Sequence, residues 1–221
     1  MNIMDIIGPV MVGPSSSHTA GAGKIGQISR KLLAEPVQQA EICFHGSFLA
    51  TGKGHGTDRA LVAGLLGLAV DDENIPNSFA IAAERNLTFS IHGIDLGDAH
   101  PNTVKMKLTG ESGRMLEIVA ASIGGGQIRI CEIDGLTANF CGEYPTLIVH
   151  NLDQPGHVTE VTSMLAHKSV NIATMQLYRD SRGGNAVMVI ECDQEVPQEA
   201  IRWLEHLEGI EKVTYLSLEE S

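Results

Sequence analysis

The run TLIVHNLDQPG at residues 146–156 sets the organisation of the C-terminal part of the chain. Its first five residues are typical of a short buried strand, and Asn151 to Gly156 have the composition of a turn. Apolar residues then recur at helical spacing from Val158 to Leu165, and this pattern stops near Ser169. The sequence therefore predicts a strand, a turn and a helix in succession.

The segment after this helix repeats the alternation of strand and helix. Two strands are predicted at Asn171 to Tyr178 and at Asn185 to Glu191, joined by a glycine-containing hairpin loop. Pro197 fits the first turn of a second helix, and Val213 to Leu218 closes as a strand. The resulting order, βαββαβ, is the ferredoxin-like arrangement.

The sequence upstream of this module has a different composition. Of the 24 glycines, 20 lie before Tyr144, and aromatic residues make up only 4% of the chain. We therefore expect two domains, residues 1–143 and 146–221, with tight loops and close backbone approaches in the first.

The first domain is predicted to be α+β. Helices are expected at Ala20 to Leu33, with Pro36 marking the end, and at Asp58 to Val70. Strands are expected at Gln39–Phe48, Leu87–His92, Thr103–Leu108, Met115–Ala121 and Gln127–Ile133.

Charge and composition exclude several classes of protein. The net charge of −12 and the absence of a Lys/Arg cluster argue against nucleic-acid binding. No apolar run reaches about 18 residues, and residues 1–5 lack the basic region of a signal peptide, so we expect a cytoplasmic protein with no membrane partner. The four cysteines are scattered without a CxxC pair, so we expect no metal site built by this chain alone.

The most distinctive stretch is GPSSSHTAG at residues 13–21. Ser15, Ser16, Ser17 and Thr19 surround His18 directly before a predicted helix. A helix N-terminus presents unpaired N–H groups and favours an anion, and the hydroxyls would add neutral donors around it. A cap needs only one hydroxyl, so we expect a site for a carboxylate or a phosphate here.

A second stretch, GKGHGTD at residues 52–58, alternates glycine with Lys53 and His55. Glycine allows the backbone to approach a ligand closely, and His55 could transfer a proton near neutral pH. The structural alternative is a flexible loop that Thr57 or Asp58 caps at the start of the next helix.

Three weaker signals remain open. On spacing alone, the HPN triplet at 100–102 is better explained as a surface turn, whereas SIGGG at 122–126 fits a hinge, a bulge or a close approach. The turn from Asn151 to Gly156 could receive a small zwitterion, or could simply join a strand to a helix.

Together, the runs at 13–21, 52–58, 100–102 and 122–126 resemble the beta subunit of the iron–sulfur-dependent L-serine dehydratases (L-serine ammonia-lyases). The C-terminal βαββαβ module with its NLDQPG turn looks like an ACT domain, an amino-acid-sensing module. The first domain resembles allosteric substrate-binding domains. The resemblance covers essentially the whole chain.

This resemblance implies dehydration of L-serine to pyruvate and ammonia, assisted by a [4Fe-4S] cluster. The cysteines that ligate the cluster belong to a separate alpha subunit in this family, and this sequence has no comparable cysteine set. The implied partners are therefore a cluster-bearing alpha subunit and L-serine, with self-association through the ACT domain. The chain should be inactive alone.

The resemblance also implies roles for individual residues. His18 and His55 are the expected catalytic contributors. The expected substrate-binding residues are Ser15, Ser16, Ser17, Thr19, Thr57 and Asn102, and the expected regulatory-ligand residues are Asn151, Asp153 and Gly156. Two alternatives stay open: a purely regulatory amino-acid-binding subunit, and a stand-alone amino-acid-binding protein.

Overall fold

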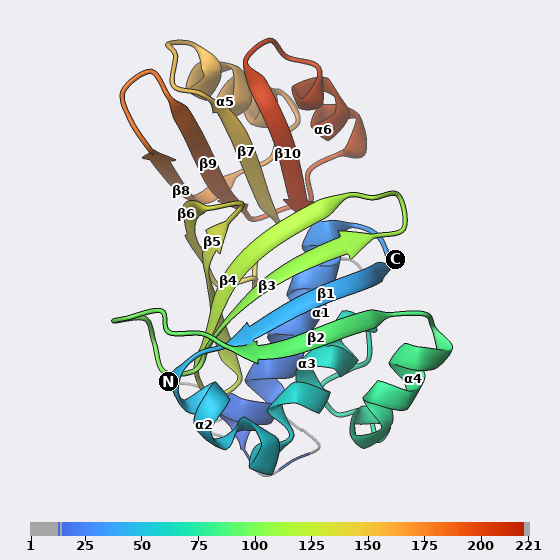
Figure 1. Cartoon of the computed structure of the whole chain (residues 1–221). Coiled ribbons are helices and arrows are strands. Elements are labelled where there is room, and N and C mark those ends of the chain that lie inside the picture. The colour runs from blue at the N-terminus through green and yellow to red at the C-terminus, as the bar shows by residue number, and fades with distance from the viewer. Residues whose placement is uncertain (1–12, 14, 219–221) are drawn as a thin grey trace, which may run out of the picture. The chain divides into compact units, whose positions relative to one another are not determined.

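A computed structural model describes residue 13 and residues 15–218. The chain divides into two compact units, one ending at Asp134 and the other beginning at Gly135 (Figure 1). In the described part of the chain, no helix is long and apolar enough to cross a membrane.

A mixed sheet forms the centre of the first unit. The strands of this sheet that belong to the first unit lie in the order β2-β1-β3-β4-β5. They are β1 (Val37–Phe44), β2 (Thr88–Gly93), β3 (Thr103–Gly110), β4 (Met115–Gly124) and β5 (Gln127–Ile133). Only β1 and β2 pair in parallel, whereas the β1–β3, β3–β4 and β4–β5 pairs are antiparallel.

The helices of this unit follow from that pairing, because two parallel strands need a long crossover between them. The crossover from β1 to β2 contains α2 (Gly46–His55), α3 (Thr57–Leu65), a 3₁₀ turn (Ile75–Asn77) and α4 (Ser78–Glu84). Before β1 come a π-helical turn (Ser16–Ala20) and α1 (Gly21–Leu33), which packs against α3 and the sheet (Figure 1).

The packing of α1 on α3 depends on glycine. A Cβ atom added at Gly64 of α3 would lie 2.1 Å from the Gly23 carbonyl oxygen of α1. One added at Gly26 would lie 2.3 Å from the Leu61 carbonyl oxygen. These distances are far below van der Waals contact, so the two backbones meet where side chains would keep them apart. The expected close backbone approaches are therefore confirmed in the first unit.

The second unit contains an antiparallel sheet in the order β10-β7-β9-β8. Its elements are β7 (Thr146–Leu152), α5 (His157–His167), β8 (Ile172–Arg179), β9 (Asn185–Cys192), α6 (Gln198–Glu205) and β10 (Ile210–Leu216). This sequence of elements and this strand order confirm the ferredoxin-like prediction, and the chain as a whole is α+β.

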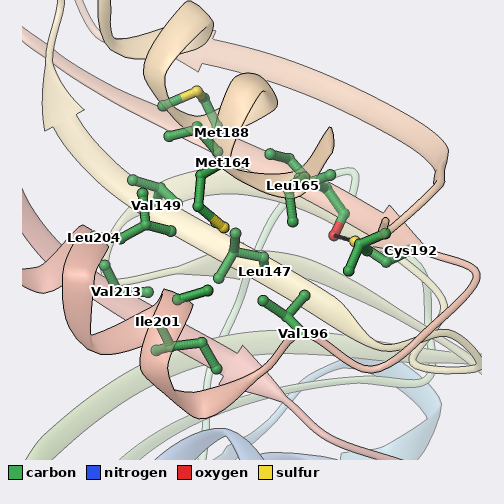
Figure 2. Close-up of a cluster of buried hydrophobic side chains, with 14 residues drawn as sticks. Leu147, Val149, Met164, Leu165, Met188, Cys192, Val196, Ile201, Leu204 and Val213 are labelled. Carbon is green, nitrogen blue, oxygen red and sulfur yellow. Dashed lines mark hydrogen bonds between the residues drawn. The ribbon is translucent and has the colours of Figure 1, made fainter. Parts of the chain in front are cut away.

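One continuous apolar core holds the second unit together (Figure 2). Leu147 and Val149 of β7 pack with Met164 and Leu165 of α5 and with Leu204 of α6. All five side chains are buried. The alternation of inward-facing residues on β7 with the helical spacing on α5 therefore produces the expected layer of helices on a sheet.

The structure departs from the sequence predictions in several segments. The stretch from Gly46 to His55, expected as the end of a strand and a glycine loop, is the helix α2. The short strand β6 (Leu136–Phe140), which was not predicted, lies in the second unit against β8 and β9. Asn139 of β6 bonds to Gln176 of β8, and along the chain the two compact units meet just before β6.

The SIGGG run ends β4 and forms the turn into β5. Gly124, Gly125 and Gly126 all have positive φ angles, and the strand register shifts between Ser122 and Gly124. Added Cβ atoms at Gly124 and Gly125 would meet nothing within 4 Å. Of the three alternatives, the run is therefore a bulged hairpin.

Candidate functional site

The site begins where the chain enters its first helix. Ser15 is extended and its Oγ accepts the backbone N–H of His18 at 3.2 Å, so it is the N-cap. Ser16 and Ser17 lie half-buried in the π-helical turn that follows. Of the four expected hydroxyls, one therefore caps the helix, as the structural alternative required.

The second wall of the site is α2, which starts at Gly46 with a φ of +55°. A Cβ atom at this position would lie 2.6 Å from the Pro101 carbonyl oxygen. Ser47 and Phe48 both donate their backbone N–H to that oxygen, at 2.7 and 3.3 Å. The HPN turn therefore caps α2 and places Asn102 next to the start of this helix.

The His18 side chain is held from both ends. Its Nδ1 lies 3.4 Å from Ser15 Oγ. Its Nε2 lies 3.2 Å from Ser47 Oγ and 3.1 Å from Thr51 Oγ1, both on α2. The ring also packs edge-on against Phe48, with 5.4 Å between centroids. These contacts fix the imidazole in one orientation.

The structure brings the two expected histidines together. The ring centroids of His18 and His55 are 4.8 Å apart, with an interplanar angle of 61°. Thr19 is buried and its Oγ1 donates to the His55 carbonyl oxygen at 3.2 Å. Burial and then the neighbouring His55 lower the pKa of His18, and the Ser47 backbone opposes that shift. Burial and His55 therefore both favour the neutral form of His18.

Several polar atoms around this pair are buried without a partner among the described residues. They are His55 Nδ1, Thr57 Oγ1, Asn102 Oδ1 and Ser122 Oγ. Thr57 and Ser122 are fully buried. Such atoms usually cost stability unless a ligand or water satisfies them, so they are candidates for polar contacts beyond those of the described residues.

Glycine again allows these groups to gather. A Cβ atom at Gly21 would lie 2.1 Å from Ser122 Oγ, so the start of α1 rests directly on β4. A Cβ atom at Gly52 would lie 3.3 Å from Thr57 Cβ. Ser122 also donates its backbone N–H to the Asn102 carbonyl oxygen at 3.0 Å. Residues from all four resembling runs therefore lie around one small region of the first unit.

The three residues expected to bind a regulatory ligand lie in the second unit, at the junction of β7 and α5. Asp153 Oδ2 accepts from Arg179 Nη1 and from the Gly183 backbone N–H, both at 2.9 Å. These two donors lower the pKa of Asp153, the Gly183 N–H first. Gly156 precedes α5 with a φ of +114° and gives no side-chain cap. Asn151 is buried, and its Oδ1 has no partner among the described residues.

Two residues of the site, Ser47 and Thr51, escaped the sequence reasoning. They lie in the segment that was predicted to be the end of a strand and a glycine loop. Isolated hydroxyl residues in such a segment do not form a recognisable motif. Their spacing of four residues is the signal, because it places both on one face of a helix once α2 is assigned.

The cysteines do not form a cluster site. Cys43, Cys131, Cys141 and Cys192 are free thiols on different strands or loops. Within the described residues, no group of three His, Cys, Asp or Glu side chains could hold a metal ion. Burial raises the pKa of each thiol, to about 11 for Cys192, which disfavours the thiolate that a metal needs. The residues of this chain do not fit an iron–sulfur cluster.

The arrangement suits acid–base chemistry on a small polar molecule. It combines two imidazoles, neutral hydroxyl donors and buried polar atoms that lack partners. These are the groups that binding a small polar molecule and moving a proton would require.

Comparison with known proteins identifies the family. The sequence-family model described as serine dehydratase beta chain matches residues 2–86. The chain is 39% identical over 216 residues to the probable L-serine dehydratase beta chain of Bacillus subtilis, covering 98% of both chains. It is 38% identical over 195 residues to the L-serine dehydratase beta chain of Peptoniphilus asaccharolyticus, covering 88% of both. The chain belongs to the L-serine dehydratase beta-chain family.

A more distant similarity links the chain to part of a larger enzyme. It is 30% identical over 201 residues to the D-3-phosphoglycerate dehydrogenase of Bacillus subtilis, which covers 89% of this chain but only 37% of that enzyme.

Proposed function

We propose that this chain is the beta subunit of an L-serine ammonia-lyase that converts L-serine to pyruvate and ammonia together with a cluster-bearing alpha subunit. The first domain, residues 1–143, supplies substrate-site residues, and residues 146–221 form an ACT domain. The observation that carries the proposal is the contact between His18 and His55, whose rings lie 4.8 Å apart although the residues are far apart in the sequence.

In this proposal the first unit binds the amino acid and handles protons. Ser15, Ser16, Ser17 and Thr19 lie at the start of the first helix, where neutral donors favour a carboxylate. Thr57 and Asn102 contribute the buried oxygens that lack partners. His18 and His55 are the groups that can take up or release a proton near neutral pH.

The [4Fe-4S] cluster is assigned to the alpha subunit, since the thiols of this chain do not fit one. A cluster iron would supply the Lewis acid that helps the serine hydroxyl to leave. This division leaves the beta chain to orient the substrate and to hold the proton-transfer groups.

The second unit is proposed to regulate or assemble the enzyme. Asn151, Asp153 and Gly156 lie at the start of α5, where backbone N–H groups lack a side-chain cap. A small amino acid would place its carboxylate there. Self-association through this domain would use the exposed edges of its four-stranded sheet. A cytoplasmic location is consistent with the reduced thiols.

Reconstitution tests the proposal. Pyruvate formation from L-serine is measured under anaerobic conditions for this chain alone, for a cluster-bearing partner alone and for the mixture. Activity that requires both chains is expected. Activity of the partner alone at the rate of the mixture would contradict a contribution of this chain to the reaction.

A second candidate is a purely regulatory subunit, favoured by the uncapped start of α5 and by the buried, unpartnered Asn151 Oδ1. In that case L-serine would bind the second unit, and changes at His18 and His55 would leave turnover at saturating L-serine intact. Calorimetric titration of the Asp153→Asn and His55→Gln variants with L-serine separates the two units as binding sites.

A further inference from the structure

The hydroxyl of Thr51 has a single proton, and the structure uses it within α2. Thr51 Oγ1 donates to the Ser47 carbonyl oxygen at 2.9 Å, one turn back along the helix. A carbonyl oxygen can only accept, so this hydrogen bond fixes the direction of the Thr51 hydroxyl. With its proton on this carbonyl oxygen, Thr51 Oγ1 presents lone pairs to its other two neighbours, Ser47 Oγ at 3.4 Å and His18 Nε2.

That lone pair faces His18. Thr51 Oγ1 and His18 Nε2 are 3.1 Å apart, and with the Thr51 proton on the Ser47 carbonyl oxygen Nε2 is the donor in this contact. The nearby Ser47 Oγ, 3.2 Å from the same nitrogen, can share this donor. An unprotonated Nε2 would instead place two lone pairs against each other.

The other ring nitrogen has a matching environment. A neutral imidazole carries one proton, so Nδ1 is unprotonated when Nε2 holds it. Ser15 Oγ lies 3.4 Å from Nδ1 and already accepts the His18 backbone N–H at 3.2 Å. Its own proton is therefore available to Nδ1.

We propose that Thr51 is a positioning residue that fixes His18 as the Nε2–H tautomer, so that Nδ1, facing Ser15 Oγ, is the only nitrogen of His18 that can take up a proton. The role of this tautomer in catalysis rests on the proposed function, whereas the tautomer itself does not. His18 then acts towards a substrate through its Ser15 side, and its Thr51 side serves as an anchor.

Nitrogen NMR of the full chain tests the tautomer directly. With ¹⁵N-labelled histidine, two-bond couplings distinguish protonated from unprotonated ring nitrogens, and a His18→Gln variant assigns the signals. We expect Nε2 protonated and Nδ1 unprotonated at neutral pH. Thr51→Val removes the acceptor and should mix the tautomers, whereas Thr51→Ser should restore the Nε2–H form.

A matched control lies on α5. Thr162 Oγ1 also donates to the carbonyl oxygen four residues back, Val158, at 2.8 Å and on an exposed helix face. Thr162→Val therefore repeats the loss of hydroxyl and backbone bond in the other unit. It should leave the His18 signals unchanged. An Nδ1–H form in the unmodified chain, or no response to Thr51→Val in a folded variant, would overturn the proposal.

Kinetics of the reconstituted complex give a second readout. Loss of one neutral hydrogen bond corresponds to roughly a fivefold change in tautomer ratio. Because kcat follows the fraction of the productive tautomer, Thr51→Val should lower kcat by up to about fivefold with little change in KM, and Thr51→Ser should recover it. If the NMR result holds but the complex releases no ammonia from L-serine, the proposed function fails and the tautomer assignment stands. If the complex is active but Nδ1 carries the proton, the tautomer assignment fails and the proposed function stands.

Discussion

The chain enters a helix at two places where a small ligand was considered from the sequence, and the two junctions are built differently. Before α1, Ser15 caps the helix and His18 is held by hydroxyls from both sides. Before α5, Gly156 gives no side-chain cap, and Asp153 accepts hydrogen bonds from Arg179 and Gly183. The first junction fixes a reactive side chain, whereas the second fixes only the loop. This contrast favours chemistry at the first and reversible binding at the second.

The largest loss of stability is expected from a change that separates α1, the helix at the first junction, from α3. In Gly64→Ala the new methyl group would meet the Gly23 carbonyl oxygen and the Gln27 nitrogen of α1, at 2.1 and 2.8 Å. Because backbone atoms cannot move aside cheaply, we expect a loss of about 3 kcal/mol in the free energy of unfolding. Urea denaturation measures it.

Gly54→Ala is the matched control, since it also lies in a helix but its added Cβ would meet nothing within 4 Å. It should be neutral or stabilise by about 0.5–1 kcal/mol. Equal losses in the two variants would mean that α1 does not depend on close contact with α3.

The second junction is sensitive to backbone conformation instead. Gly156 has a φ of +114° and open space around its Cα, so Gly156→Ala is opposed by strain and not by a clash. We expect a loss of about 1–3 kcal/mol. Thermal unfolding should show it, with Gln154→Ala in the same exposed turn as the control. An unchanged Tm would show that the turn adopts another conformation.

The pH dependence of stability should distinguish the first junction. Burial and the neighbouring His55 lower the pKa of His18 in the folded chain, so the unfolded chain binds its proton more readily. This contribution to stability is complete above the ordinary histidine pKa of about 6.5 and is lost as the pH falls below it.

Urea midpoints at several pH values across this range should therefore fall towards acid, and His18→Gln should flatten that slope. His92→Gln, an exposed change in the same unit, is the control. A slope that survives in His18→Gln would assign the effect to another group.

The smallest effect is expected at Asp153. The Gly183 N–H and Arg179 lower the pKa of this carboxyl, so its stabilising contribution is present above the ordinary pKa and is lost as the pH falls through the lowered value. Asp153→Asn should slightly destabilise the chain at neutral pH and reduce its sensitivity to acid. Asp98→Asn, at an exposed position of the first unit, is the control. The same dependence of stability on acid for both variants would show that the bonds of Asp153 to Arg179 and Gly183 do not stabilise the loop.

Regular periodicity made the second unit predictable. The continuous apolar run of β7 and the helical spacing of α5 match the burial of these elements, so the order of elements in this unit could be inferred from the sequence. The same reasoning missed α2, because Gly46, Gly52 and Gly54 have low helix propensity. Tertiary contacts override that propensity, since the Pro101 carbonyl oxygen binds the first N–H groups of the helix.

The candidate site was predictable to the extent that it lies in motifs. His18, His55 and the hydroxyl run were recognised because unusual residues cluster in sequence. Ser47 and Thr51 were not recognised, because their role depends on α2, which the sequence does not predict, and on contacts with His18, which is distant in the sequence. A hydroxyl cap was anticipated, but the choice of Ser15 for it and the bond from Thr19 to the His55 carbonyl oxygen could not be foreseen, because both depend on the folded backbone.

The most direct test of the account is the turnover of the reconstituted complex when both histidines of this chain are replaced. The measurement is kcat at saturating L-serine for the His18→Gln/His55→Gln variant, with the exposed His92→Gln variant as control. A loss of at least about a hundredfold is expected for the double variant, with the control unchanged. Full turnover in the double variant would contradict the account and would assign this chain a purely regulatory role.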